Sequence, residues 1–184
     1  MVYSDLDAQD IPSQQPTNFQ PQDFSMSDWI EAGTRAPAFT LTADDGAKVR
    51  LSALKGNPVV LYFYPKDDTP GCTREACAFR DAQNELKGLG VQLYGLSPDD
   101  VESHARFRDK FHLNFPLLAD PGHKVAEKYG AWREKNMYGK KTMGIQRSTF
   151  LIDATGKVVK LWKQVRVDGH DQKVLEAVES LVSE

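Results

Sequence analysis

One segment restricts the fold more than any other. Residues 58–64, Pro-Val-Val-Leu-Tyr-Phe-Tyr, are almost continuously apolar and rich in β-branched and aromatic side chains. A strand with one wet face alternates polar and apolar residues, whereas an unbroken apolar run is typical of a strand covered on both faces. We therefore expect a central sheet with helices against both faces, in a chain whose 184 residues suit one sizeable core.

The segments around this strand predict alternating strands and helices. The expected elements are a hairpin of residues 39–41 with 49–51, a strand at 58–64, a helix at 73–87, a strand at 91–96, a helix from residue 97 or 99 to 112, a strand at 115–118, a helix at 121–129, a hairpin of 148–152 with 157–165, and a helix at 171–182. Residues 58–96 form a strand-helix-strand unit. The pattern predicts an α/β domain.

Charge divides the chain into an N-terminal tail, residues 1–34, and a domain, residues 35–184. The tail holds six acidic side chains and no lysine or arginine, which leaves 20 acidic and all 23 basic residues to the domain. Such a composition, with prolines and glutamines, indicates a flexible segment that we expect to stay undocked. Its apolar residues, which would contact the domain or a partner if it docked, are Phe19, Phe24, Met26, Trp29 and Ile30.

Charge and hydropathy also exclude several classes of partner. A net charge of −3 without a basic cluster gives no footprint for nucleic acid or an anionic membrane surface. No apolar stretch approaches the roughly 18–20 residues of a membrane helix, and the N-terminus lacks the order of a secretion signal. We therefore expect a cytoplasmic protein. Two cysteines are too few for a disulfide-stabilised secreted scaffold.

Residues 64–77, Tyr-Pro-Lys-Asp-Asp-Thr-Pro-Gly-Cys-Thr-Arg-Glu-Ala-Cys, concentrate the reactive side chains where the buried strand gives way to a helix. Cys72 is expected in the first helical turn, where free backbone N–H groups and the helix dipole favour a thiolate. Pro65 stiffens the loop, Gly71 permits close approach, and the Thr69 hydroxyl can donate to a sulfur or a bound oxygen. The pattern predicts a nucleophilic thiol.

The spacing of Cys72 and Cys77 has a mechanical consequence. Residues five apart on one helix are separated by about 7.5 Å along the axis and about 140° around it, which puts their Cα atoms about 8–9 Å apart. A disulfide needs less than about 7 Å between them. If the two cysteines pair, the first turns of the helix must unwind.

Three other interpretations of the cysteines remain open on the residues alone. Buried free cysteines are often inert core residues. A thiol–disulfide oxidoreductase usually spaces its cysteines as Cys-x-x-Cys, which differs from the spacing here. Cys-x4-Cys is also half of a zinc-site pattern, although no histidine pair is suitably spaced. The four histidines are His104, His112, His123 and His170.

The flanking residues favour the first, nucleophilic interpretation. Pro65-x-x-x-Thr69-x-x-Cys72, within the longer 64–77 stretch, resembles the active site of the bacterioferritin comigratory protein, or Q-type, peroxiredoxins. The similarity runs from about residue 36 to the C-terminus. It includes Phe-Arg-Asp at 79–81, Tyr-Gly-Leu-Ser at 94–97, Tyr-Gly-Ala-Trp at 129–132 and Arg-Ser-Thr-Phe-Leu-Ile-Asp at 147–153.

The resemblance implies a thioredoxin-like fold, with a central mixed β-sheet flanked by helices and an N-terminal β-hairpin. It implies that Cys72 is the peroxidatic cysteine, that Cys77 is the resolving cysteine, and that Pro65 and Thr69 shape the pocket. The arginine of the family falls on Arg147. A guanidinium suits that position because its planar fork of donors stays charged and can stabilise both a thiolate and a developing oxyanion.

The implied activity is a thiol-dependent peroxidase that reduces hydrogen peroxide and organic hydroperoxides. A Cys72 sulfenic acid would condense with Cys77, and thioredoxin or a similar dithiol protein would reduce the disulfide. The resemblance implies no metal, flavin or haem, and an intramolecular resolving cysteine suggests a monomer. The alternative is a redox sensor or holdase that Cys72 oxidation switches once, without turnover.

Neighbouring residues receive no chemical role from the sequence. Glu75 could hydrogen-bond within the site, but a carboxylate in a first helical turn commonly only complements the helix dipole, so Glu75 is interpreted as a supporting residue. Residues 66–68, Lys-Asp-Asp, are expected to form a solvated loop, and Tyr129 and Trp132 are expected in the core.

Overall fold

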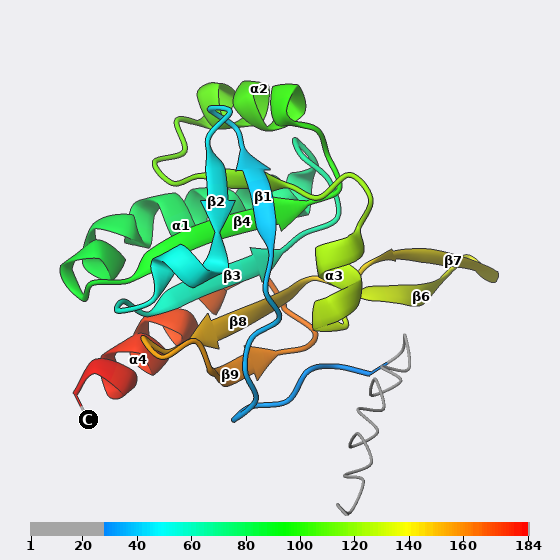
Figure 1. Ribbon diagram of the computed structural model, residues 1–184. Helices are drawn as coiled ribbons and strands as arrows, with labels where there is room; N and C mark the ends of the chain where they lie inside the picture. The colour runs from blue at the N-terminus through cyan, green and yellow to red at the C-terminus, as the bar shows by residue number, and fades with distance from the viewer. Residues whose placement is uncertain (1–27, 184) are drawn as a thin grey trace, which may run out of the picture.

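The computed structural model describes residues 28–183 of the chain (Figure 1). Its elements are β1 (Thr40–Ala43), β2 (Lys48–Arg50), the 3-10 helix η1 (Leu51–Leu54), β3 (Val59–Phe63), α1 (Pro70–Gly88), β4 (Gln92–Ser97), α2 (Val101–Phe111), β5 (Leu117–Ala119), α3 (Lys124–Tyr129), β6 (Trp132–Met137), β7 (Lys140–Ile145), β8 (Ser148–Ile152), β9 (Val158–Trp162) and α4 (His170–Val182). Strands and helices alternate through the first half, as the sequence predicts.

Seven strands form one mixed sheet in the order β2-β1-β5-β4-β3-β8-β9. The apolar run supplies β3, which is buried along its whole length and pairs parallel with β4 and antiparallel with β8. The predicted unit of β3, α1 and β4 is therefore confirmed. β3 lies inside the sheet, between β4 and β8, so the loop that follows its carboxyl end leaves from the middle of the sheet.

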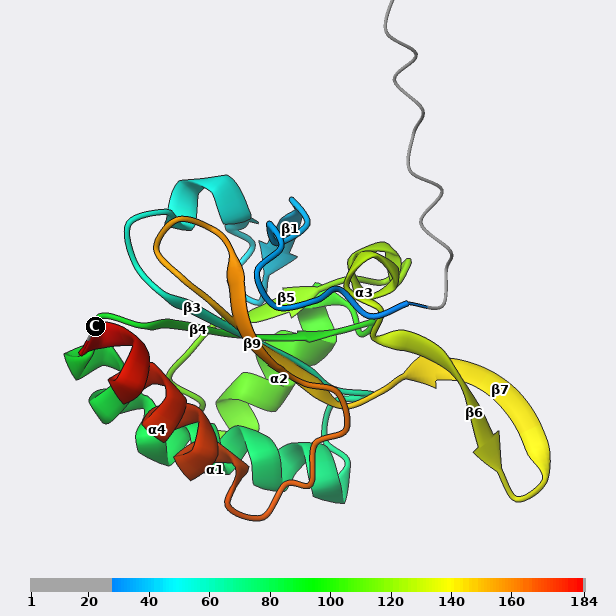
Figure 2. The same cartoon turned by 90° about the horizontal axis from the view of Figure 1, so that it is seen from below.

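Helices cover both faces of this sheet, as the apolar run requires. α1, α2 and α4 lie against one face, where Phe79, Phe107 and Val174 share a core with the alternate residues of β3 (Figure 2). α3 covers the opposite face, where Tyr129 packs with Phe150 at a ring distance of 5.1 Å. The predicted α/β architecture with helices on both faces is confirmed.

The segment before β1 lies against the domain, contrary to the expectation of an undocked tail. The Trp29 ring lies 6.1 Å from that of Phe150, and Ile30 is buried in the same core. Gly130, at φ +79°, makes this possible, since an added Cβ would lie 2.6 Å from the Asp28 carbonyl oxygen. Three other tail residues named above, Phe19, Phe24 and Met26, lie outside the described residues.

The β6–β7 hairpin was not predicted. It extends away from the rest of the domain in both views (Figure 1, Figure 2) and pairs along its length from Trp132↔Ile145 to Met137↔Lys140. The turn residues Tyr138 and Gly139 have φ of 53° and 79°, as a two-residue hairpin turn with a primed geometry requires. Both strands are largely polar and exposed, so no apolar run marks them in the sequence.

Helix starts differ from the predicted ones by a few residues. α1 begins at Pro70, three residues earlier than expected, because proline suits the first helical position. The N-cap of α2 is Asp100, whose side chain accepts from the Ser103 N–H at 2.7 Å. The predicted capping residues have another role, since the Ser97 hydroxyl donates to Asp99 at 2.6 Å.

No helix of the described part is long and apolar enough to cross a membrane.

Candidate active site

The start of α1 positions Cys72. Thr69 is the N-cap in extended geometry, Pro70 follows at the first helical position, and Cys72 is the third residue of the helix. Its side chain is 2% exposed and belongs to the core beneath the helix. The predicted placement in the first turn is confirmed, with the free N–H groups and positive dipole end that favour a thiolate.

Arg147 lies directly against the sulfur. Its Nη2 donates to Cys72 Sγ at 3.3 Å, and its Nη1 pairs with Glu75 Oε2. The arginine immediately precedes β8, and the pairing of Phe63 with Ser148 brings it to the carboxyl end of β3, where the cysteine loop emerges. Two elements 75 residues apart in the chain thus meet at one thiol.

Glu75 corrects the interpretation given to it from the sequence. Its side chain is 1% exposed, so it does not complement the helix dipole from the surface but forms a buried pair with Arg147. Burial raises the pKa of Glu75 to about 7, although Arg147 acts to lower it. Its second oxygen, Oε1, is buried without a hydrogen-bond partner in the described part of the chain. The spacing of three residues from Cys72, one helical turn, was the available signal.

Two cationic side chains interact electrostatically with the sulfur. Burial acts to lower the pKa of Arg147, but the adjacent Glu75 and Cys72 together raise it above its usual value. Lys135 of β6 is half-buried, and its pKa is lowered by burial and by Arg147, while Cys72 opposes that shift. Lys135 could not be predicted as a neighbour of Cys72, because the hairpin that carries it has no apolar pattern. Arg147 and Lys135 therefore place positive charge at this end of the site.

The loop ahead of Cys72 is closed by its own hydrogen bonds. The Thr69 hydroxyl donates to the Lys66 carbonyl at 3.0 Å, instead of donating to the sulfur as the sequence suggested. Pro65, just after β3, is half-buried. Gly71 allows the expected close approach, because a Cβ there would lie 3.2 Å from Arg147 Nη2. The loop and the guanidinium therefore share one tightly filled space.

Cys77 lies farther along the same unbroken helix and is partly exposed, and both cysteines are free thiols. Because α1 runs without interruption from Pro70 to Gly88, the two residues keep the five-residue helical separation that a disulfide cannot span. Unwinding on pairing stays a prediction. Within residues 28–183, no group of three or more histidine, cysteine or acidic side chains is placed to hold a metal ion.

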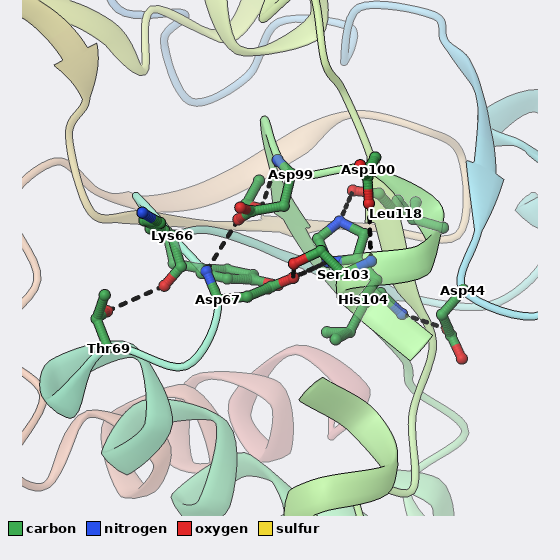
Figure 3. Close-up of polar contacts among 12 residues, drawn as sticks. Asp44, Lys66, Asp67, Thr69, Asp99, Asp100, Ser103, His104 and Leu118 are labelled. Atoms are coloured by element: carbon green, nitrogen blue, oxygen red, sulfur yellow. Dashed lines mark hydrogen bonds and ion pairs between the residues drawn. The ribbon is translucent and has the colours of Figure 1, made fainter. Parts of the chain in front are cut away.

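The expectation of a solvated loop at residues 66–68 is wrong for its central residue. Asp67 is only 7% exposed, while Lys66 and Asp68 are exposed as expected. Its carboxylate accepts from the Tyr64 hydroxyl at 2.6 Å and from the Ser103 hydroxyl at 2.8 Å (Figure 3). The sequence could not predict this burial, because no local pattern distinguishes Asp67 from its exposed neighbour Asp68.

Comparison with known proteins agrees with this geometry. Residues 32–161 match the model of the AhpC/TSA family. The chain is 51% identical over 146 residues to a putative peroxiredoxin bcp of Coxiella burnetii, covering 79% of this chain and 97% of that protein. It is 47% identical to peroxiredoxin Bcp of Bacillus subtilis, covering 83% and 97%. A solved structure of Xanthomonas campestris bacterioferritin comigratory protein superposes with a TM-score of 0.78 at 38% identity, covering 83% and 99%.

The fold and the matches define the class of protein as a thioredoxin-fold peroxiredoxin, an oxidoreductase that reduces peroxides with a thiol. The chain belongs to the AhpC/TSA family, and its curated relatives are Bcp peroxiredoxins. The family resemblance found in the 64–77 motif is thereby confirmed.

Proposed function

We propose that the chain is a two-cysteine peroxidase in which Cys72 attacks the peroxide and Cys77 resolves the product, with Arg147, Thr69 and Pro65 forming the site. The observation that carries this proposal is the 3.3 Å hydrogen bond from Arg147 Nη2 to the buried sulfur of Cys72. A guanidinium in that position stabilises a thiolate before the reaction and an oxygen anion during it.

The first step forms a sulfur–oxygen bond and breaks the oxygen–oxygen bond. The Cys72 thiolate attacks one peroxide oxygen, and the other oxygen leaves as hydroxide or alkoxide, which takes up a proton to become water or an alcohol. Cys72 becomes a sulfenic acid, oxidised by two electrons. Arg147 stabilises the negative charge as it passes from sulfur to the departing oxygen, so its contribution is largest in the transition state.

In the second step the Cys77 sulfur displaces the hydroxyl of the sulfenic acid, which leaves as water, and a Cys72–Cys77 disulfide forms. This step requires the first turns of α1 to unwind, because the cysteines are five residues apart on a continuous helix. A dithiol protein then reduces the disulfide by exchange, giving up two electrons and two protons. We infer thioredoxin or a protein of the same chemistry as that reductant.

The proposed substrates are hydrogen peroxide and organic hydroperoxides. The bacterioferritin comigratory protein of Xanthomonas campestris has alkyl peroxide reduction activity, which supports the organic substrate here. We also propose a monomer, because the resolving thiol lies in the same helix and no second subunit is needed for the chemistry. A cytoplasmic location would supply the dithiol reductant.

Mass spectrometry of the wild type, Cys72→Ser and Cys77→Ser after one equivalent of hydrogen peroxide tests this proposal, with NADPH-coupled thioredoxin turnover alongside. We expect a Cys72–Cys77 disulfide in the wild type, a Cys72 sulfenic acid in Cys77→Ser, and sustained turnover in the wild type alone. Oxidation of Cys72 without turnover would favour the sensor alternative. No reaction at either cysteine would disprove the peroxidatic assignment.

A further inference from the structure

We propose that His104 is a positioning residue for the peroxide reaction: through Asp67 it fixes the loop between β3 and α1 in the conformation that lets peroxide reach Cys72. The inference rests on the proposed role of Cys72 as the peroxidatic cysteine. His104 belongs to α2 and is not assigned to the reacting atoms, so it would act through the loop and not on the substrate.

The His104 ring is completely buried, at 0% exposed, and both ring nitrogens have partners (Figure 3). Nε2 lies 3.1 Å from the carbonyl oxygen of Leu118 in β5. Nδ1 lies 2.9 Å from Asp67 Oδ2 and 3.1 Å from Asp67 Oδ1. The ring therefore connects the sheet, through β5, with the loop that carries the cysteine.

The donors and acceptors around this pair define its chemistry. A carbonyl oxygen can only accept, so the Nε2 facing Leu118 carries a hydrogen. The Tyr64 and Ser103 hydroxyls both donate to the Asp67 carboxyl group. The Tyr64 hydroxyl also lies 3.3 Å from Nδ1, and the Nδ1 contact with Asp67 bridges the ring and the carboxyl group. This bridge is a short, buried connection that an apolar or smaller side chain would not reproduce.

The loop needs such a connection because its backbone is strained beside Asp67. Asp68 has φ of +55°, a left-handed conformation that costs a non-glycine residue about 1 kcal/mol or more and persists only where its surroundings enforce it. The Asp67 N–H donates to Asp99 Oδ2 at 2.9 Å, which holds the same point from the end of β4. Thr69, the N-cap of the cysteine helix, follows directly. The hydrogen bonds of Asp67 therefore hold the loop in place immediately before α1 begins.

Loss of the His104–Asp67 contact should therefore change the geometry around Cys72 more than its ionisation. Reaction with peroxide requires the sulfur, the loop and Arg147 to be correctly placed relative to one another. Small misplacements of reacting groups lower the rate about tenfold to a hundredfold. Alkylation by iodoacetamide requires only an accessible thiolate. The ratio of the two rate constants therefore separates positioning from a general effect on the thiol, while unfolding is detected separately by thermal melting.

Two substitutions of His104 each retain one of the two hydrogen-bonding positions of the ring. In His104→Asn the side-chain amide occupies the place of Nδ1 and can still donate to Asp67. In His104→Gln the amide reaches the place of Nε2 and retains the Leu118 contact instead. In a Cys77→Ser background we expect the peroxide rate constant of His104→Gln to fall about tenfold or more, with little change in iodoacetamide alkylation, and His104→Asn to stay within about threefold.

The same measurements on Asp67→Asn and Lys110→Ala complete the test, with folding checked by thermal melting. Asp67→Asn removes the carboxylate without removing side-chain volume and should reproduce the selective loss, even if a His104 variant fails to fold. Lys110→Ala removes the exposed ion pair with Asp68, 2.6 Å long, and the contact of the ammonium group with the Phe111 ring, and should react as the parent protein does.

Equal peroxide rates in His104→Gln and the parent would overturn the inference, as would a parallel fall in both reactions or equal losses in the Asn and Gln variants. A parent protein whose Cys72 does not react with peroxide would instead refute the proposed function.

Discussion

At the scale of single residues, the guanidinium of Arg147 joins three residues of the cysteine helix, since it contacts Cys72 and Glu75 and lies against Gly71. The place of Cys72 in the first turn of α1 could be predicted from the sequence because it depends on local features, a helix start with characteristic flanks. The burial of Asp67 could not be predicted, because a buried carboxylate is defined by partners from distant elements, and the sequence does not show which charges those elements bury. For Glu75 the available signal was its spacing of three residues from Cys72.

Arg147→Lys should lower the rate constant of Cys72 oxidation about a hundredfold while leaving the protein folded. Lysine keeps the positive charge, but its single ammonium group cannot donate in two fixed directions to Cys72 and Glu75 as the planar fork does. Losing one such donor typically costs about 10²–10³ in rate. Stopped-flow kinetics with hydrogen peroxide measure the effect, and Arg166→Lys, an exposed change of the same type, is the control. Equal rates for both variants would contradict this role.

Gly71→Ala should slow Cys72 oxidation several-fold without destabilising α1. The added Cβ would approach Arg147 Nη2 to 3.2 Å, so the nitrogen that donates to Cys72 must shift by a few tenths of an ångström. Alanine also favours a helix over glycine by up to about 1 kcal/mol, so a slower reaction would not reflect a weaker helix. Gly88→Ala, on the same helix with no described atom within 4 Å of the new Cβ, should keep the parental rate.

At the scale of elements, what could be predicted follows the distribution of apolar residues. β3, β4 and β8 are buried strands, and α1 ends at a glycine, so each is marked by its own sequence even though the start of α1 was placed three residues too late. The β6–β7 hairpin has no such mark, because most of its side chains face solvent. The docking of Trp29 and Ile30 depends on a surface built by α3 and β8, which no local pattern in an acidic tail reveals.

Gly130→Ala should detach the segment at residues 28–30 and reduce the free energy of unfolding by about 1–3 kcal/mol. The new Cβ would lie 2.6 Å from the Asp28 carbonyl oxygen and 2.7 Å from Trp29 Cα, and backbone atoms cannot give way cheaply. Gly139→Ala is a matched control, since its φ is also +79° and no described atom lies within 4 Å. Urea denaturation of both variants separates the effect of the lost contact with residues 28–30 from the effect of backbone strain, which the two variants share. If the two variants lose equal stability, the contact with residues 28–30 contributes nothing.

At the scale of the whole molecule, two buried groups give the folded state opposite responses to pH. Burial raises the pKa of Glu75 from 4.5 to about 7, so the folded state prefers its protonated form, and this contribution to stability is lost as pH rises through that interval. Burial, with smaller effects of Lys173 and Arg147, lowers the pKa of His170 from 6.5 to about 4. The folded state therefore prefers neutral His170, and that contribution is lost as pH falls from 6.5 toward 4.

Each shift amounts to about 3 kcal/mol at about 1.4 kcal/mol per pKa unit, and the two changes overlap between pH 4.5 and 6.5 with opposite sign. Urea denaturation across that range should show the difference between wild type and each variant. Glu75→Gln should gain stability relative to the wild type as pH rises, because the wild type alone must ionise a buried carboxyl group. His170→Gln, whose amide can still reach the Thr149 hydroxyl now 2.7 Å from Nε2, should gain relative stability as pH falls. A difference that does not change with pH would show that the variant's group titrates alike in the folded and unfolded chains. Because the two contributions have opposite sign, the stability of the wild type should stay nearly constant in this range. If the stability differences of the two variants change with pH in opposite directions, this constancy is a cancellation between the carboxyl group of Glu75 and His170, the histidine that begins α4.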